Sequence, residues 1–132
     1  MVSQGDIFYV NFNPSRGHEQ MNKRPAIALS NDLVCQTSNM TIVAPISSTK
    51  RNFPMYHRLT SSQTVYGKVL LDQTIALDLR ARHVTDETIV DHVSREELEE
   101  IITLYKLLFS IDDKLEEVIY LVLKQITPKS MI

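Results

Sequence analysis

The sequence predicts a mainly β domain followed by C-terminal helices, an α+β chain whose strands form a small, curled antiparallel barrel or sandwich. Five to seven short stretches rich in β-branched and aromatic residues occupy the first 93 residues, with polar turns between them. Helical periodicity begins only after Val93, so no βαβ crossover is indicated. The length of 132 residues suits one domain spanning 1–132, with the barrel over about 3–93.

Each strand is predicted from an apolar or alternating stretch bounded by turn residues. Pro25 cannot donate to a ladder, so the second strand should begin near it or lie at an edge. The segment 31–38 predicts a turn or one helical turn, and 13–23 and 47–54 predict polar loops. The strands are expected over residues 6–12, 24–30, 40–46, 55–60, 68–71, 73–79 and 88–93.

Two helices are predicted at the C-terminal end, over 94–109 and 111–126. Ser94-Arg95-Glu96-Glu97 has the S-x-x-E pattern of a capping box and precedes apolar residues at helical spacing. A second cap, Ser110 to Asp113, opens the next helix, which Pro128 ends. The face with Val118, Ile119 and Val122 is too apolar to stay exposed, so we expect it to be buried.

The composition limits the function classes. Hydrophobic residues are 43% and charged residues 23%, with 3 Gly and 5 Pro, which excludes a disordered or collagen-like chain. No apolar run is long enough for a membrane span and no signal peptide is visible, so we expect a cytoplasmic protein. The single cysteine, Cys35, rules out an intrachain disulfide, and no metal-ligand spacing occurs.

The charge is unevenly distributed along the chain. Residues 1–83 hold nine Lys/Arg and five Asp/Glu, whereas residues 84–132 hold five and eleven. This asymmetry suggests an anion-binding face on the first part, whereas a solvated acidic helix surface is the favoured interpretation of the second part.

Three clusters carry the side chains that chemistry would need. Segment 15–24 contains Arg24, which suits phosphate, and His18, which titrates near neutrality; a flexible charged hairpin is the alternative. Residues 47–51 place hydroxyls and cations at a strand end, as in a phosphate-binding or merely solubilising turn. Asp72-Gln73 puts a carboxylate directly after a strand, either functional or a turn cap. Structural or surface roles are expected for His57, His83, His92 and Cys35.

Several of these residues together resemble the MazF/PemK/Kid toxin family, over about residues 3–109. The resemblance implies a homodimer of SH3-like barrels that cleaves single-stranded RNA, usually mRNA, at short sequences without a metal or cofactor. The ribose 2′-OH would attack, leaving a 2′,3′-cyclic phosphate and a 5′-hydroxyl. A cognate antitoxin with an acidic, disordered tail would compete for the RNA groove. The matching positions are Gly5-Asp6-Ile7, Asn13-Pro14, Gly17-His18-Glu19-Gln20, Arg24-Pro25, Ser30, Val43-Ala44-Pro45-Ile46-Ser47, Asp72-Gln73 and Arg80.

The resemblance also implies roles for individual residues. Arg24 would lie beside the scissile phosphate and Ser47 would contact it, with His18 and Asp72 as further catalytic residues. Leu70 stands where some relatives have an arginine, which favours a mechanism centred on Arg24 and Ser47. A guanidinium stabilises charge but is a poor base, so the base stays open among His18, Asp72, Glu19 and water. Substrate-binding roles are expected for Glu19, Gln20, Asn22, Ser48, Lys50, Arg51, Gln73 and Arg80, and stacking roles for Met21, Phe53 and Tyr56.

Two other readings compete with the ribonuclease. One is a non-catalytic toxin of the same fold, like the CcdB gyrase poisons, which act through C-terminal residues. The other is an inactive relative kept as a nucleic-acid-binding or regulatory protein. The retained Arg24 and Ser47 argue against the first, whereas Leu70 and the additional helix 111–126 keep the second open.

Overall fold

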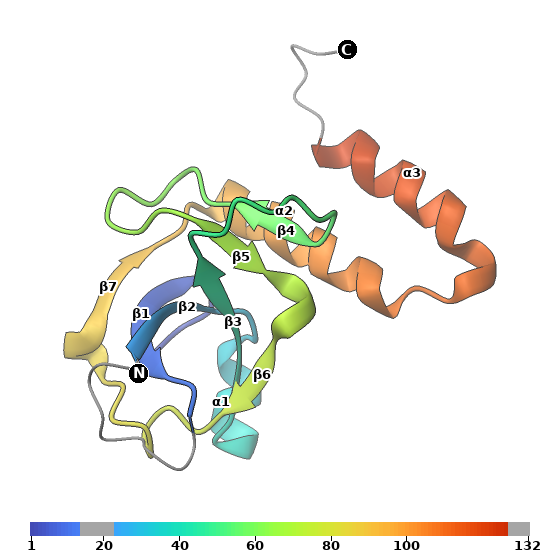
Figure 1. Cartoon of the computed structure of the whole chain (residues 1–132). Helices are drawn as coiled ribbons and strands as arrows, with labels where there is room; N and C mark the ends of the chain where they lie inside the picture. Colours follow the sequence, from blue (N-terminus) through green and yellow to red (C-terminus); the bar gives the residue numbers. More distant parts are fainter. Residues whose placement is uncertain (14–22, 127–132) are drawn as a thin grey trace.

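The computed structural model describes residues 1–13 and 23–126, and the predicted order of strands followed by helices is confirmed there (Figure 1). The strands are β1 (Asp6–Asn11), β2 (Lys23–Ala28), β3 (Thr41–Ser47), β4 (Tyr56–Arg58), β5 (Lys68–Leu70), β6 (Ile75–Leu77) and β7 (Ile89–His92). The α-helices are α1 (Asp32–Ser38), α2 (Arg95–Lys106) and α3 (Leu115–Ile126). Single 3-10 turns are η3 (Leu71–Gln73), η4 (Asp86–Thr88), η5 (Leu107–Phe109) and η6 (Asp112–Lys114).

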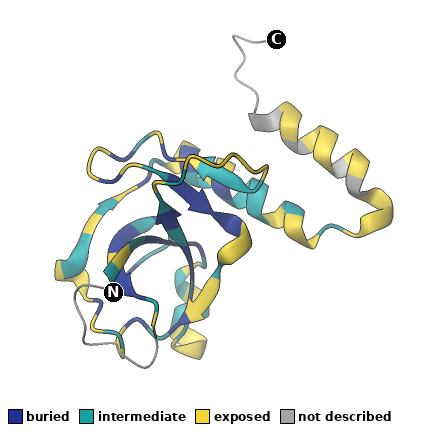
Figure 2. Cartoon of the chain, in the orientation of Figure 1, coloured by how far each residue is buried: buried dark blue, intermediate teal, exposed yellow. Residues whose placement is uncertain are grey.

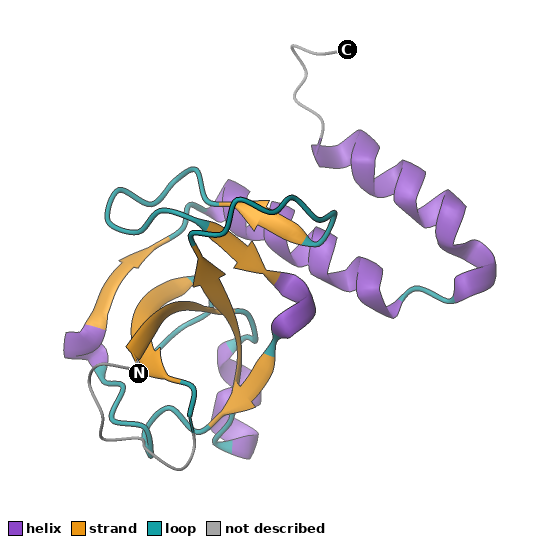
Figure 3. Cartoon of the chain, viewed as in Figure 1, coloured by secondary structure: helices purple, strands orange, loops and turns teal. Residues whose placement is uncertain are grey.

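The strands form one antiparallel sheet in the order β4-β5-β3-β2-β1-β7. The outer edge of β3 is shared, because its first half pairs with β6 and its last two residues pair with β5. The sheet curls strongly (Figure 3). Among the strands that the structure describes, no pairing joins β7 to β4 or β6, so closure of the expected barrel is not detected.

Alternation along the strands gives the sheet two apolar faces (Figure 2). Ile7 and Ile27 contribute to one buried cluster, which Ile101 of α2 completes. Phe8 belongs to the other cluster, which the segment after β6 covers with Leu79. Full burial of such side chains contributes about 1.5–3 kcal/mol each, so these clusters hold the strands in register.

The segment 31–38 folds into the short helix α1, slightly more than the predicted turn. The Asn31 side chain accepts a hydrogen bond from the Val34 N–H at 3.2 Å. Asn39 adopts a left-handed conformation with φ of 63° and donates its N–H to the Cys35 carbonyl. Asparagine suits both ends because it caps an N-terminus and tolerates positive φ.

The capping box predicted for α2 forms only in part. The Ser94 hydroxyl accepts a hydrogen bond from the Glu97 N–H at 3.1 Å, as predicted. The Ser94 N–H, however, donates to Ser61 Oγ at 2.9 Å rather than to the Glu97 carboxylate. The Glu97 side chain is therefore available for a different set of partners, described below.

The predicted burial of the last helix is wrong for Ile119, whereas the side chains of Val118 and Val122 lie outside the described part of the chain. The helix begins at Leu115, later than expected, and Figure 1 shows it projecting from the sheet. Ile119 is 36% exposed, and Tyr120, Leu121 and Leu123 are more than half exposed. The α2 helix already covers the sheet face that an additional helix would need. In the described part of the chain, no helix is long and apolar enough to cross a membrane.

Candidate functional site

Arg24 and Ser47 lie on neighbouring strands at the same end of the sheet. The ladder between β2 and β3 pairs Ala26 with Pro45. Arg24 and Ser47 each lie two residues beyond this pair on their respective strands, so the register, if continued, would place them opposite each other. Directly opposed residues share a face, with Cβ atoms roughly 4.5–5.5 Å apart. The guanidinium and the hydroxyl that the family resemblance implies thus come from the same end of neighbouring strands.

Ser47 is also held from its other side, by the start of β5. It pairs with Lys68, and its Oγ accepts a hydrogen bond from the Thr49 N–H at 3.1 Å. Gly67 has φ of +137°, and a Cβ built there would lie 2.5 Å from the Ser47 carbonyl oxygen. Only glycine permits this approach, so Gly67 helps to set the position of Ser47.

Lys68 is a contributor that sequence reasoning missed, because it opens an otherwise apolar strand. Its side chain is buried, with 4% of the residue exposed. The Nζ atom donates to the Arg51 carbonyl at 2.7 Å and to Asn52 Oδ1 at 2.6 Å. These two hydrogen bonds from the buried ammonium hold the 48–54 loop in position beside Ser47. A lysine directly after glycine and before three apolar strand residues was the signal available in the sequence.

The predicted substrate-binding residues of the 47–51 segment take different positions. Ser48 and Lys50 are exposed at the mouth of a pocket that Lys68 also lines. Arg51 instead lies over the ring of Phe53, with Cζ 4.8 Å from the ring centroid. Phe53 in turn packs against Tyr56, so these two rings, proposed for stacking on bases, contact each other.

The remaining predicted site residues are not gathered around Ser47. Asp72 and Gln73 lie in η3, on the order of 10 Å further along the strand direction than Lys68. Gln73 donates to the Tyr56 hydroxyl at 3.3 Å. Among the described residues, no hydrogen bond joins Asp72 to Arg24 or Ser47. Within one chain, the structure therefore leaves Asp72 outside the Arg24–Ser47 pair.

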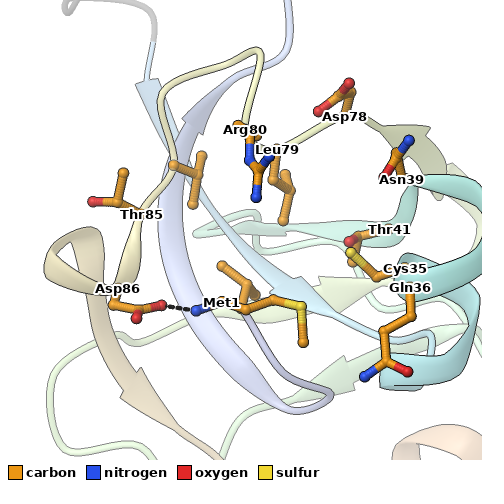
Figure 4. A pocket seen from close by; sticks show the side chains of 12 residues that line it. Met1, Cys35, Gln36, Asn39, Thr41, Asp78, Leu79, Arg80, Thr85 and Asp86 are labelled. Atoms are coloured by element: carbon orange, nitrogen blue, oxygen red, sulfur yellow. Dashed lines mark hydrogen bonds and ion pairs between the residues drawn. The ribbon is translucent and has the colours of Figure 1, made fainter.

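Arg80 lines a different pocket, of about 570 Å³ (Figure 4). Figure 4 shows it near Asp78, while Asn39 and Thr41 mark the start of β3 on the same pocket. Since Ser47 ends β3, Arg80 lies toward the opposite end of that strand. His18, Glu19, Gln20 and Asn22, with Met21, lie outside the described residues; the segment that bears them joins β1 to β2.

A second polar cluster surrounds Glu97, on the α2 side of the sheet, and we call it the Glu97 cluster. The Glu97 carboxylate accepts hydrogen bonds from the N–H groups of Thr60 and Ser61 at 2.7 and 2.9 Å, and from both hydroxyls. His57 Nε2 lies 2.8 Å from Glu97 Oε2. His57 thus has the structural role that the sequence suggested, with a partner that the sequence did not reveal.

Hydrogen bonding sets the charge state of the Glu97 cluster. Burial raises the pKa of Glu97, but hydrogen bonds from Ser61, His57 and Thr60 outweigh burial and lower that pKa to about 2. Asp91 lies nearby in β7, and hydrogen bonds from Ser62 and the His92 N–H lower its pKa to about 2. Both carboxylates are therefore ionised at neutral pH. In the part of the chain that the structure describes, no group of three or more metal-ligating side chains occurs.

Comparisons with known proteins find relatives in sequence. Residues 3–109 match the family model of the PemK-like, MazF-like toxin of type II toxin–antitoxin systems. The endoribonuclease toxin MazF of Escherichia coli is 32% identical over 81 residues, which cover 61% of this chain and 72% of that protein. The endoribonuclease toxin ChpB of the same species is 40% identical over 85 residues, covering 60% and 72%.

The fold is likewise similar to solved structures. A crystal structure of MazF from Deinococcus radiodurans aligns with a TM-score of 0.67 and 27% identity, covering 83% of this chain and 96% of that one. A crystal structure of MazE-MazF from the same organism aligns with a TM-score of 0.66 and 22% identity, with the same coverage. In both cases the similarity extends over almost the whole of the solved chain.

Proposed function

The chain belongs to the PemK-like, MazF-like family of toxins of type II toxin–antitoxin systems, and on that premise we propose that it is an endoribonuclease that cleaves single-stranded RNA without a metal. The observation that carries the proposal is that Arg24 and Ser47 lie at the same end of the neighbouring antiparallel strands β2 and β3. Relatives named as endoribonuclease toxins support the reaction class. We also propose short-sequence specificity, with mRNA as the cellular substrate.

The proposed reaction is an internal transesterification. The ribose 2′-oxygen bonds to the adjacent phosphorus, the bond from phosphorus to the 5′-oxygen breaks, and that oxygen takes up a proton. The products are a 2′,3′-cyclic phosphate and a 5′-hydroxyl. Negative charge grows on the phosphoryl oxygens during attack, and the forked donors of Arg24 stabilise it. The Ser47 hydroxyl donates to one of the same oxygens.

The proton on the 2′-OH needs a separate acceptor. A guanidinium is a poor proton acceptor, so Arg24 is assigned to charge stabilisation and not to proton removal. Asp72 lies too far along the strand direction to reach a 2′-OH at Ser47 within one chain. His18 and Glu19 are the candidates that remain besides water, and His18→Gln and Glu19→Gln variants would assign the base through the pH–rate profile.

The decisive experiment incubates the protein with long single-stranded RNA in EDTA and maps the 5′ ends. Wild type should cut at a recurring short sequence, and Arg24→Ala should lower the rate by about 10²–10³-fold while staying folded, because Arg24 is exposed. Arg95→Ala removes an arginine whose side chain is 87% exposed on α2 and serves as the control. Unchanged cutting by Arg24→Ala would overturn the assignment, and no cutting by wild type would favour an inactive relative.

Ser47→Ala tests the second member of the pair. Loss of a hydrogen bond to a charged group is worth about 1.5–3 kcal/mol, so the rate should fall roughly 10- to 100-fold. Ser47→Thr keeps the hydroxyl and should restore most of the rate. A reduction of less than about threefold in Ser47→Ala would remove Ser47 from the mechanism.

The partners are proposed on the same basis. We propose a homodimer and a cognate antitoxin with an acidic, disordered tail. Membership of a family of toxins from type II toxin–antitoxin systems supports the antitoxin. Competition of such a tail with RNA for the Arg24–Ser47 surface would appear as antitoxin-dependent loss of RNA binding.

A further inference from the structure

A basic pocket of about 370 Å³ lies beside Ser47, because Ser48 and the cross-strand partner of Ser47, Lys68, both line it. Three of its lining side chains are cations, Lys50, Arg58 and Lys68, and the side chain of Tyr66 also lines it. None of the residues that line it carries a carboxylate. We call this site the basic pocket.

The strand register ties the basic pocket to Ser47. Lys68 pairs with Ser47 across β3 and β5, and with Arg58 across β5 and β4. Opposed residues share a face, so the side chains of Ser47, Lys68 and Arg58 form one row on the sheet. With strands roughly 4.8 Å apart, Arg58 lies about 10 Å from Ser47 across the sheet. The basic pocket therefore continues the surface proposed for the scissile phosphate.

The charge of Lys68 lacks a counter-ion in the described part of the chain. Its two hydrogen-bond acceptors are a carbonyl and an amide oxygen, both neutral. Placing an ammonium in a buried site without a carboxylate is unfavourable, and Lys50 and Arg58 add repulsion. An anionic ligand would relieve both effects. Glu97, by contrast, receives all its donors from within the chain and needs no ligand.

We propose that the basic pocket binds a second phosphate of the single-stranded RNA, one that flanks the scissile phosphate held at Arg24 and Ser47. Tyr66 is 79% exposed and offers an open ring face for stacking of the neighbouring base. Cations that follow the backbone beside an exposed ring are typical of single-strand binding sites. The assignment rests on the proposed ribonuclease function, whose substrate-binding surface it extends.

Arg58→Gln is the principal test, because Arg58 is exposed and its removal leaves the core intact. Affinity for single-stranded RNA, measured by fluorescence anisotropy, should fall about tenfold. The slope of log affinity against log salt should decrease by about 0.7, the value for one phosphate contact on a single strand. Arg95→Gln, which alters an exposed arginine on α2, should change neither quantity.

A scan of the substrate locates the phosphate. In an oligonucleotide that contains the cleavage sequence, each flanking phosphate is replaced in turn by a neutral methylphosphonate. One flanking replacement should raise KM for wild type but have little further effect in Arg58→Gln, because that contact is already lost. Lys68→Met should behave in the same way; if it fails to fold, Arg58→Gln still decides.

The outcomes separate this proposal from the proposed function. If wild type cleaves and Arg58→Gln matches it in affinity, salt slope and phosphonate scan, the subsite is wrong and the ribonuclease stands. If wild type does not cleave, the function fails, and the anisotropy comparison still tests the subsite. If Arg58→Gln weakens binding of poly-glutamate but not of RNA, the pocket serves an acidic protein and the proposal is overturned.

Discussion

Two polar clusters lie on the two faces of the hairpin formed by β4 and β5. His57 points towards α2 and joins the Glu97 cluster, whereas its neighbour Arg58 points to the opposite face and lines the basic pocket. Alternation along a strand separates the two environments by a single residue. One hairpin thus contributes residues to both the Glu97 cluster and the basic pocket.

The clusters differ in whether their charge is compensated within the chain. The Glu97 carboxylate is surrounded by donors from one loop, and no buried side-chain polar atom among the described residues lacks a hydrogen-bond partner. The basic pocket has hydrogen-bonded atoms too, but its net charge is positive. The Glu97 carboxylate has all its hydrogen bonds supplied by the chain, which indicates a structural role. In the basic pocket the hydrogen bonds are made but the positive charge is not neutralised, which indicates a binding site.

The largest expected effect on stability concerns the Glu97 cluster. Glu97→Ala should lower the free energy of unfolding by about 3 kcal/mol, because the Thr60 and Ser61 N–H groups and His57 lose their buried acceptor. Urea denaturation measures the change. Glu99 lies two residues further along α2 and its side chain is 69% exposed, so Glu99→Ala should lower the free energy of unfolding far less. Equal losses of unfolding free energy in the two variants would show that the Glu97 cluster contributes little to stability.

An intermediate effect is expected at Gly67, and it sharpens the contrast between stability and activity. Gly67→Ala forces a Cβ against the Ser47 carbonyl, so it should cost about 1–3 kcal/mol of stability and also displace Ser47. Gly5→Ala imposes a similar backbone penalty at φ of +92°, but its Cβ would meet the side chains of Leu98 and Val93 at the ordinary contact distances of 3.4 and 3.5 Å. At temperatures where both are folded, only Gly67→Ala should lower kcat. Equal kcat values would mean that Gly67 does not position Ser47.

The last prediction concerns the pH dependence of stability, which has no effect at neutral pH and appears only when the protein is acidified. The pKa of Glu97 lies near 2 in the folded protein against an ordinary value of 4.5, so its ionised form stabilises the fold above about pH 4.5. Unfolding free energy should then fall as the pH drops from about 4.5 towards 2, with Asp91 contributing below about 3.8. Glu97→Gln should make the unfolding free energy depend less on pH in this range. Chemical denaturation at several pH values measures the dependence. An unchanged slope would assign the acid sensitivity to other groups.

Local sequence patterns were enough for most of the fold. Apolar alternation located the strands, and Ser94 marked the start of α2. The pattern failed where the partner of a side chain was remote. Glu97 has the spacing of a capping-box residue, yet loop donors some 36 to 40 positions earlier in the chain bind its carboxylate.

The sequence by itself determined the antiparallel β architecture with trailing helices, which depends on periodicity, turn chemistry and residue type, all local properties of the chain. The resemblance of its motifs to a known family singled out Arg24 and Ser47. Only the tertiary structure decided that these two residues lie at the same end of neighbouring strands, that Asp72 and Arg80 lie elsewhere, and that Lys68 and Arg58 form a row with Ser47. Strand register and burial fix these neighbours, and both arise from contacts between residues far apart in the sequence.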